Sequence, residues 1–288
     1  MPARLPSLCF LFASVCLTAC VDRPVTDLTS VEPQFITYGT NDEDDTFDNV
    51  GAFIVQDPTT GQIFPICSGT LISSTVFLTA AHCTAAYLQE LAPLGYTVFV
   101  SFSNPIGFGT MTSKSTKLVA VTAVVTNPGY NQAQDDSGDI GVLIVEARGT
   151  RGISPATLPA LGLLDQLASA GALKRAVFTA VGYGVQNRVS GGGVPYFQDT
   201  NPIPRMYAFS SFNALGPGYL RLSQNPAKGD GGTCFGDSGG PDFLPVNGTM
   251  ILVATTVTGD AVCRSTNVDY RIDTASARAF LGRYVTLP

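Results

Sequence analysis

Short apolar segments separated by turn residues recur along most of the chain. In the first half they cover residues 50–56, 69–72, 96–102, 118–126 and 140–145, and in the second half 176–183, 219–222, 250–257 and 269–272. Many of their residues are β-branched, and glycine, proline and asparagine lie between them. Short, regularly spaced segments of this kind predict an all-β barrel or sandwich.

Helical periodicity is confined to two places. Residues 161–173 predict a short connecting helix, and residues 274–284 predict a helix late in the chain, with Ala279, Phe280 and Tyr284 among its apolar positions. Thr274 is the expected N-cap of the second helix, and Asp273 is the alternative.

Composition narrows the class of protein. Of 288 residues, 45% are hydrophobic and 13% charged, and the 30 glycines and 19 prolines indicate a folded, turn-rich chain. The formal charge is −6 and lysine and arginine form no cluster, which argues against a nucleic-acid partner. The protein is expected to be a monomer. The acidic stretch 41–45 is expected to be a solvated turn, because it lacks the spaced glycine and distal glutamate of a calcium loop.

The first residues carry a targeting pattern. Arg4 precedes an apolar stretch, and residues 1–19 therefore predict a secretory signal that is too short to be a membrane helix. The segment Leu17-Thr18-Ala19-Cys20 resembles the lipobox of bacterial lipoproteins, which implies a lipid on Cys20. The alternative is an ordinary cleaved signal, although Leu17 fits its small-residue rule poorly. Residues 20–35 are expected to be a tether or propeptide.

One segment carries a candidate nucleophile: Cys234-Phe235-Gly236-Asp237-Ser238-Gly239-Gly240-Pro241. Glycines on both sides of Ser238 permit a tight backbone path that exposes its hydroxyl. A five-residue glycine–serine–glycine match alone is equally consistent with an ordinary turn. A serine nucleophile needs a base, and the chain contains a single histidine, His82.

The segment from Cys67 to Cys83, which ends in Thr79-Ala80-Ala81-His82-Cys83, resembles the histidine motif of the trypsin/chymotrypsin-like serine peptidases. Gly236 to Pro241 resembles their serine motif, and the two motifs stand in that family's order. The resemblance covers about residues 36–285. It implies two packed six-stranded antiparallel β-barrels with a C-terminal helix, the first barrel over about 36–150 and the second over about 165–288.

The same resemblance implies an aspartate between the two motifs, at the start of an apolar strand. Asp139 directly precedes the segment 140–145, and Asp135 and Asp136 are the alternatives. The expected activity is that of an exported serine endopeptidase acting through an acyl-enzyme on protein or peptide substrates, without a cofactor or a metal. An esterase is an alternative among enzymes, because the same acyl chemistry attacks esters, but the α/β-hydrolase order, in which serine comes first, is contradicted by this chain. The alternative function is binding or adhesion on an inactive peptidase scaffold.

Further roles follow from the resemblance. It implies an oxyanion hole formed by the N–H groups of Gly236 and Ser238, and disulfides Cys67–Cys83 and Cys234–Cys263. Its substrate pocket maps to Gly232, Thr233, Gly259 and Val268. Because no charge lies at these positions, small or medium apolar side chains are expected before the scissile bond, with Asp260 or Asp269 as alternative acidic groups.

Two features concern activation and a departure from the family. Cleavage between Phe35 and Ile36 would free an amino group on Ile36 that is expected to pair with Asp237. The family usually has a serine, an aromatic residue and glycine where this chain has Val257-Thr258-Gly259. Asp139 is therefore expected to depend on other donors, such as Thr256.

The protein is expected to be a membrane-anchored lipoprotein in the bacterial periplasm or at the cell surface, or to be secreted after cleavage.

Overall fold

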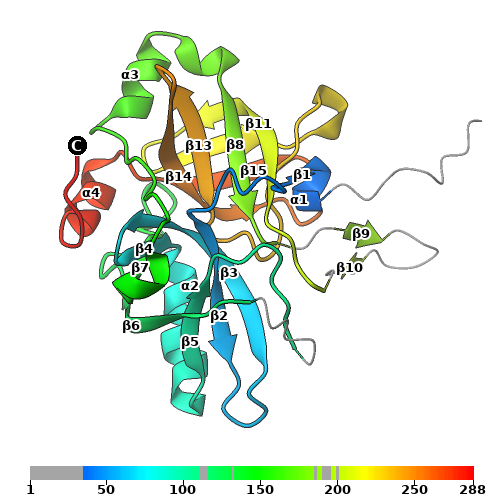
Figure 1. Cartoon of the computed structure of the whole chain (residues 1–288). Coiled ribbons are helices and arrows are strands. Elements are labelled where there is room, and N and C mark those ends of the chain that lie inside the picture. The colour runs from blue at the N-terminus through cyan, green and yellow to red at the C-terminus, as the bar shows by residue number, and fades with distance from the viewer. Residues whose placement is uncertain (1–34, 110–115, 132, 185–186, 190–195, 199–200) are drawn as a thin grey trace, which may run out of the picture. The chain divides into compact units, whose positions relative to one another are not determined.

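The structure is a computed structural model that describes residues 35–288 except 110–115, 132, 185–186, 190–195 and 199–200 (Figure 1). The predicted signal, lipobox and tether lie outside the described residues. No helix in the described part of the chain is long and apolar enough to cross a membrane.

The first barrel closes from six antiparallel strands in the order β2-β3-β4-β7-β6-β5. Its strands are β2 (Val50–Gln56), β3 (Ile63–Ser73), β4 (Val76–Thr79), β5 (Thr97–Ser101), β6 (Val119–Thr126) and β7 (Gly141–Val145). Apolar side chains of alternate positions fill the barrel, among them Phe53, Leu71, Phe77 and Leu143, which are fully buried. The short apolar segments of the first half of the chain therefore supply the core of this barrel.

The second barrel closes because β8 pairs with both β13 and β11. Its strands are β8 (Val177–Gly182), β11 (Met206–Leu215), β12 (Tyr219–Ser223), β13 (Pro241–Val246), β14 (Thr249–Gly259) and β15 (Thr266–Arg271), and β1 (Thr40–Asn41) is added on the edge of β11. The prediction of two six-stranded antiparallel barrels is confirmed. β1 lies on the second barrel, whereas the sequence had placed residues from 36 onward in the first.

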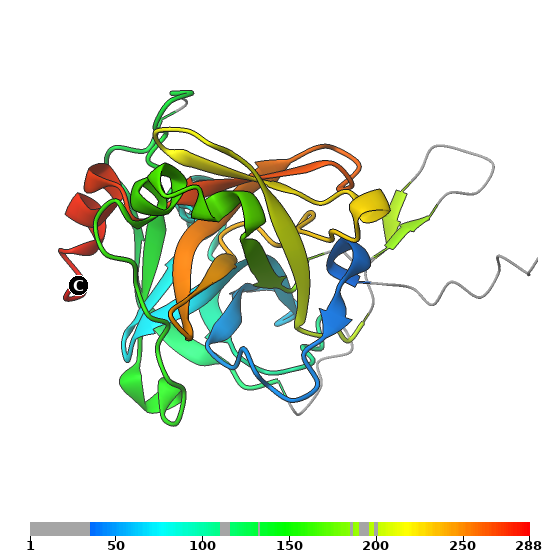
Figure 2. The same cartoon turned by 90° about the horizontal axis from the view of Figure 1, so that it is seen from above.

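Few helices accompany the barrels. They are α1 (Phe35–Tyr38), α2 (Ala81–Ala86), α3 (Leu163–Ser169) and α4 (Ala275–Leu281), with short π or 3-10 turns at 87–91, 92–94, 147–150, 172–175 and 226–228 and a small hairpin of β9 (Asn187–Val189) and β10 (Tyr196–Gln198). Thr274 caps α4, because its hydroxyl accepts a hydrogen bond from the N–H of Ala277. Figure 2 shows α3 in green and α4 in red on the side of the molecule away from α1.

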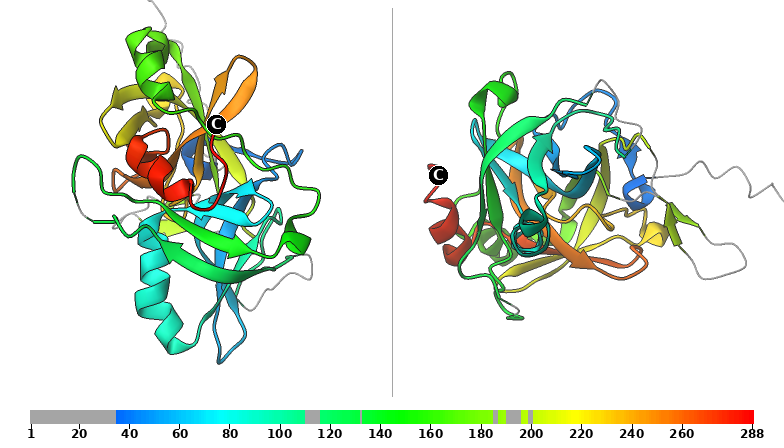
Figure 3. Two further views of the ribbon diagram at one scale, coloured as in Figure 1. Left: turned by 90° about the vertical axis from the view of Figure 1, so that its left-hand side faces the viewer. Right: turned by 90° about the horizontal axis from the view of Figure 1, so that it is seen from below.

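A continuous apolar cluster joins the two barrels. Val50 and Leu78 of the first barrel meet Val181 and Phe243 of the second, and Phe280 of α4 packs against the same cluster. Figure 3 shows α4 in red beside strands of both barrels. Burial of this apolar surface fixes the seam between the barrels.

A buried ion pair lies beside the seam and corrects one expectation. Asp42, in the acidic stretch expected to be a solvated turn, is 1% exposed and accepts a hydrogen bond of 2.7 Å from Nε of Arg205. Arg205 is itself fully buried and donates to Asp45 and to the carbonyl oxygen of Val50. The partner lies 163 residues away in the sequence, so local pattern could not indicate this burial.

The interior of the second barrel holds a pair of buried aspartates. Asp242 lies opposite Ala180 and Ala254, and Asp269 lies opposite Leu220, so both side chains share the inner face of the barrel. Both residues are fully buried, and their four carboxyl oxygens have no hydrogen-bond donor in the described chain.

The pKa values of this pair are shifted upward. Burial raises the pKa of Asp242 to about 7, and burial together with the charge of Asp242 raises the pKa of Asp269 well above its ordinary value. Two carboxylates cannot hydrogen-bond each other, but a neutral carboxyl can donate to a carboxylate. The pair therefore holds protons that the unfolded chain releases.

This protonation makes stability depend on pH. Between about pH 4, where unfolded aspartate ionises, and pH 7, the folded protein binds more protons than the unfolded chain, so the contribution of the pair falls as pH rises. We expect Asp242→Asn to raise the free energy of unfolding at pH 8 by up to roughly 4 kcal/mol, with little effect at pH 4.

Thermal unfolding of both proteins from pH 4 to 8 measures this difference. The exposed Asp44→Asn variant is the matched control and should follow the wild type. A variant Asp242→Asn that unfolds at or below the wild-type temperature at pH 8 would contradict the assignment.

Candidate active site

His82 and Asp139 are brought together by two paired strands. His82 follows β4 in the first turn of α2, Asp139 precedes β7, and Thr79 of β4 lies opposite Gly141 of β7. The imidazole Nδ1 lies 2.9 Å from Oδ2 of Asp139, and the backbone N–H of His82 donates to Oδ1, also at 2.9 Å. The carboxylate is buried and accepts from the ring and the backbone at once, which fixes the imidazole orientation and leaves Nε2 free.

The alternative aspartates have other positions. Asp136 accepts hydrogen bonds from the hydroxyls of Tyr270 and Ser276, and Asp135 is exposed. Thr256 was an expected donor to Asp139, but its hydroxyl has no hydrogen-bond partner in the described part of the chain. The carboxylate of Asp139 therefore depends on His82 alone among the donors that the structure describes.

Ser238 lies on a loop that is hydrogen-bonded to the first barrel. The N–H of Ser68 on β3 donates to the carbonyl oxygen of Ser238 at 2.9 Å, and the Ser68 hydroxyl donates to the carbonyl oxygen of Gly236 at 3.0 Å. Gly239 packs so closely on the segment before His82 that a Cβ would lie 2.2 Å from the hydroxyl of Thr79. Only glycine fits there, and the serine loop is thereby held beside the histidine. Sequence reasoning gave Ser68 no role, although it lies inside the histidine motif.

The backbone around Ser238 leaves donors unused. Gly236 has a φ of 95°, a left-handed conformation that favours glycine. Within the described residues, neither the N–H of Gly236 nor that of Ser238 donates a hydrogen bond to the protein. Both belong to partly exposed residues, so these N–H groups can bind an incoming oxygen atom.

Asp237, between them, is fully buried, and no cation pairs with it among the described residues. Its carboxylate accepts hydrogen bonds of 2.8 Å from the N–H groups of Gly184 and Cys234, and no described ion pair includes it. Burial raises its pKa to about 7, although the two donors oppose the shift. A buried carboxylate in this state is stabilised by any cation that reaches it.

Ile36 lies near this region in an unusual backbone conformation. Its side chain is buried against Met206 and Ala208, and its φ is 36°, which is an outlier for a β-branched residue. The next residue, Thr37, accepts a backbone hydrogen bond from Gly232. Met206 lies opposite Gly182, and a Cβ on Gly182 would lie 2.2 Å from the Asp237 carboxylate.

The residues assigned to the substrate pocket differ in their surroundings. Gly232 and Thr233 are buried, Gly259 is exposed and Val268 is partly exposed. The Thr233 hydroxyl donates to Oδ1 of Asn267 at 2.6 Å, and strand alternation places Val268 on the opposite face of β15. Sequence reasoning missed Asn267, because a one-residue change of register exchanges the two faces.

The two alternative acidic groups are also placed. Asp260 accepts hydrogen bonds from the N–H groups of Ser265 and Thr266 at 2.7 and 2.8 Å and so closes the turn between β14 and β15. Asp269 is one of the buried pair inside the second barrel, two residues beyond Asn267 on the same face of β15.

Both expected disulfides, Cys67–Cys83 and Cys234–Cys263, are formed. The first sets two sulfur atoms beside His82, in a geometry that could suggest a metal site. Because both sulfurs are in a disulfide, they offer no thiolate to a metal.

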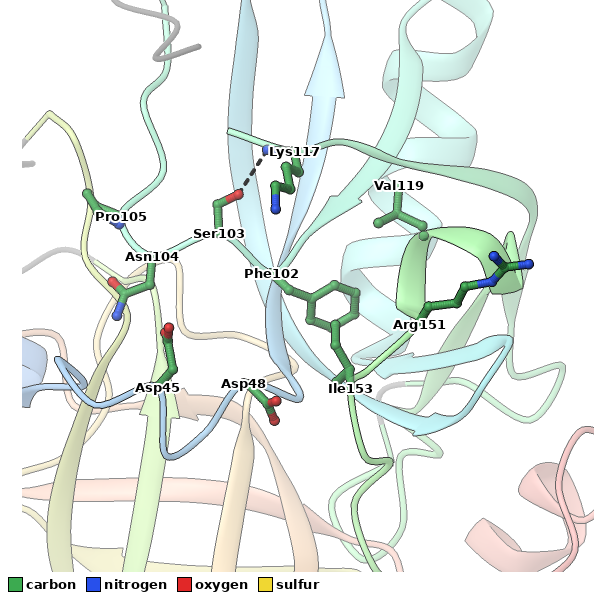
Figure 4. A pocket seen from close by; sticks show the side chains of 11 residues that line it. Asp45, Asp48, Phe102, Ser103, Asn104, Pro105, Lys117, Val119, Arg151 and Ile153 are labelled. Carbon is green, nitrogen blue, oxygen red and sulfur yellow. Dashed lines mark hydrogen bonds between the residues drawn. The ribbon is translucent and has the colours of Figure 1, made fainter. Parts of the chain in front are cut away.

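A cavity of 540 Å³ lies at the other end of the first barrel. The residues that line it lie after the ends of β5 and β7 and at or before the starts of β2 and β6. His82, after the end of β4, and Asp139, before the start of β7, lie at the opposite strand ends. Figure 4 shows Asp45 and Asp48 on one side of this cavity and Lys117 and Arg151 on the other. It contains no member of the His82–Asp139 pair or of the serine loop.

Comparison with known protein families gives a match. The family model described as Trypsin matches residues 41–280, which is most of the chain. A search among curated proteins finds no significant match.

Proposed function

The chain belongs to the trypsin family of serine proteases, and from this premise we propose that it is an active endopeptidase whose nucleophile is Ser238. The observation that carries the proposal is the His82–Asp139 contact beside a serine loop with two unused N–H donors. The substrate is a protein or peptide, because the family consists of proteases and the chemistry of such a site is acyl transfer.

In the proposed reaction the Ser238 hydroxyl attacks the substrate carbonyl carbon while Nε2 of His82 accepts its proton. Asp139 stabilises the imidazolium that forms. The proton then passes to the leaving amine as the C–N bond breaks, which leaves an acyl-enzyme, and water attacks the ester by the same sequence. The Ser238 hydroxyl has no hydrogen-bond partner among the described residues, so substrate binding has to complete the contact with His82.

The developing oxyanion has two donors in this proposal. The N–H groups of Gly236 and Ser238 would bind it, and the hydrogen bonds from Ser68 to this loop hold both groups in place before substrate binds. Preorganised donors of this kind supply a large share of the catalytic effect. The binding or adhesion alternative is less well supported, because such a protein has no need of all three side chains.

Mutation of the triad tests the proposal. We expect Ser238→Ala and His82→Ala to lower kcat by up to about a million-fold, because the triad acts as a unit. Asp139→Asn should lower it by about ten-thousand-fold, since the amide favours the wrong imidazole tautomer.

Initial rates on a peptide mixture, with the cleavage products identified by mass spectrometry, measure these effects. Asp136→Asn is the control and should keep most of the activity. Near-normal turnover by Asp139→Asn would refute the assignment of the acid, and near-normal turnover by Ser238→Ala would refute that of the nucleophile.

We further propose that Ile36 and Asp237 form an activation pair. Cleavage after Phe35 would release the strained backbone at Ile36 and create an ammonium group in the region of the uncompensated carboxylate. Pairing would stabilise the ionised form of Asp237 and the neighbouring oxyanion donors with it. The alternative is a chain that is active uncut.

N-terminal sequencing of the active species tests activation. Protein that begins at Ile36 should be active, and the uncut chain should be at least roughly tenfold less active, as for the loss of one buried ion pair. Asp237→Asn should abolish the difference between the two forms. Equal activity of an uncut preparation that begins at Cys20 or Val21 would contradict the pairing.

The sequence further supports the proposal that residues 1–19 form a signal and that Cys20 carries a lipid. The family and the two disulfides point to an extracellular protein. The lipobox resemblance adds a bacterial membrane anchor in the periplasm or at the surface, from which cleavage at Ile36 would release a monomeric enzyme.

Metabolic labelling with a palmitate analogue tests the anchor. Wild type should be labelled, and so should Cys16→Ala, because both proteins keep the acceptor Cys20. Cys20→Ala should carry no label. A Cys20→Ala protein with wild-type labelling would exclude this residue as the lipid site.

A further inference from the structure

Gln224 occupies the space that a side chain at position 232 would need. It directly follows β12 and is fully buried. A Cβ on Gly232 would lie 2.3 Å from Oε1 of Gln224 and 2.6 Å from its Cβ, distances that real Cβ atoms do not show. The first pocket residue therefore lacks a side chain, and Gln224 fills its place.

The same side chain extends toward the opposite wall of the pocket. A Cβ on Gly259 would lie 3.6 Å from Nε2 of Gln224. That nitrogen donates to Oδ1 of Asp260 at 3.2 Å and to the carbonyl oxygen of Thr266 at 3.4 Å. Because both partners only accept, the NH2 group faces them and Oε1 faces Gly232. The amide is thus held in one orientation across the gap.

A second contact lies beside Gln224. Thr233 and Asn267 are both buried and hydrogen-bonded through their side chains, and Asn267 lies opposite Gly259 in the β14–β15 ladder. The space between the segment at Gly232 and Gly259 is therefore closed by side chains of the protein itself.

This space adjoins the nucleophile. The N–H of Gly239 donates to the carbonyl oxygen of Thr256 on β14, and the Cys234–Cys263 disulfide joins the serine loop to the turn after β14. If the oxygen of an acyl group on Ser238 binds the N–H of Gly236, the side chain of the acyl residue would extend along these two segments. This step depends on the proposed function.

We propose that Gln224 is the residue that sets specificity, by limiting the side chain before the scissile bond to glycine, alanine or serine. A longer side chain would have to displace a buried amide that two hydrogen bonds hold, or overlap with it. The sequence alone suggested small or medium apolar side chains; Gln224 removes the room for leucine, methionine or lysine. The substrates are then proteins or peptides with exposed alanine- or serine-containing segments.

The test is a set of peptides that differ only at the residue before the scissile bond, with alanine, leucine, methionine or lysine there. For wild type we expect kcat/KM to be at least roughly tenfold higher on the alanine peptide than on the methionine peptide. Gln224→Ala should bring this ratio close to one, and Gln224→Gly should do the same or reverse it, because each removes the atoms that fill the space.

Two further variants separate size from other effects. Gln224→Met keeps the length of the side chain without its hydrogen bonds and should retain the preference for alanine. Gln166→Ala, an exposed change on α3, is the matched control and should give the wild-type ratio. Thermal unfolding shows which variants are folded, and the ratio within one variant does not depend on the amount of active enzyme.

The outcomes separate the two proposals. A folded wild type that cleaves the methionine peptide as well as the alanine peptide, or a Gln224→Ala variant with the wild-type ratio, contradicts the role of Gln224 alone. A folded wild type that cleaves none of the peptides, like Ser238→Ala, contradicts the proposed function and the inference together.

Discussion

The close fit of the serine loop into the seam between the barrels is the constraint on which the site depends. Gly239 lies against the hydroxyl of Thr79 with no room for a Cβ, and Ser68 holds the loop by its N–H and its hydroxyl. These contacts connect the second barrel, which carries the nucleophile, to the first, which carries His82. A change in the packing of the barrels would therefore move the nucleophile relative to its base, and small displacements of this kind are costly in catalysis.

Charges that are expensive to bury lie at this seam and inside the second barrel. Arg205 is compensated by Asp42 and Asp45, but Asp237 and the pair Asp242–Asp269 have no cation among the described residues. The charge of Asp237 also contributes to the raised pKa of Asp242. Protonation of the buried aspartates is therefore coupled to the loop that positions the oxyanion donors. A cation placed at Asp237 would act on both.

Much of the architecture could be predicted, and the reasons for the omissions are physical. β2 was predicted with its observed bounds, and α4 with its cap, because a short apolar segment between turn residues and a capping side chain are local signals. β11 and β13 were missed. β13 begins Pro241-Asp242, and proline and aspartate are both unusual in strands.

The residues of the site also divide into those that the sequence could indicate and those that it could not. Ser238, His82 and Asp139 could be named as candidates because two motifs resemble a known family. In the structure the carboxylate of Asp139 contacts the imidazole of His82. Gln224 and Asn267 could not be named, since their contacts join segments far apart in the sequence. Ser68 lies inside a recognised motif, yet its hydroxyl bonds to the serine loop at Gly236, which is 168 residues away in the sequence.

Reaction with a fluorophosphonate most directly tests the central claim, that the seam presents an activated serine. The Ser238 hydroxyl would displace fluoride from phosphorus as His82 takes its proton. Intact-mass and peptide-mapping mass spectrometry of the treated protein should show a single adduct on Ser238, formed far more slowly in His82→Ala. Absence of an adduct on the folded, processed wild type, or equal rates in wild type and His82→Ala, would contradict the account.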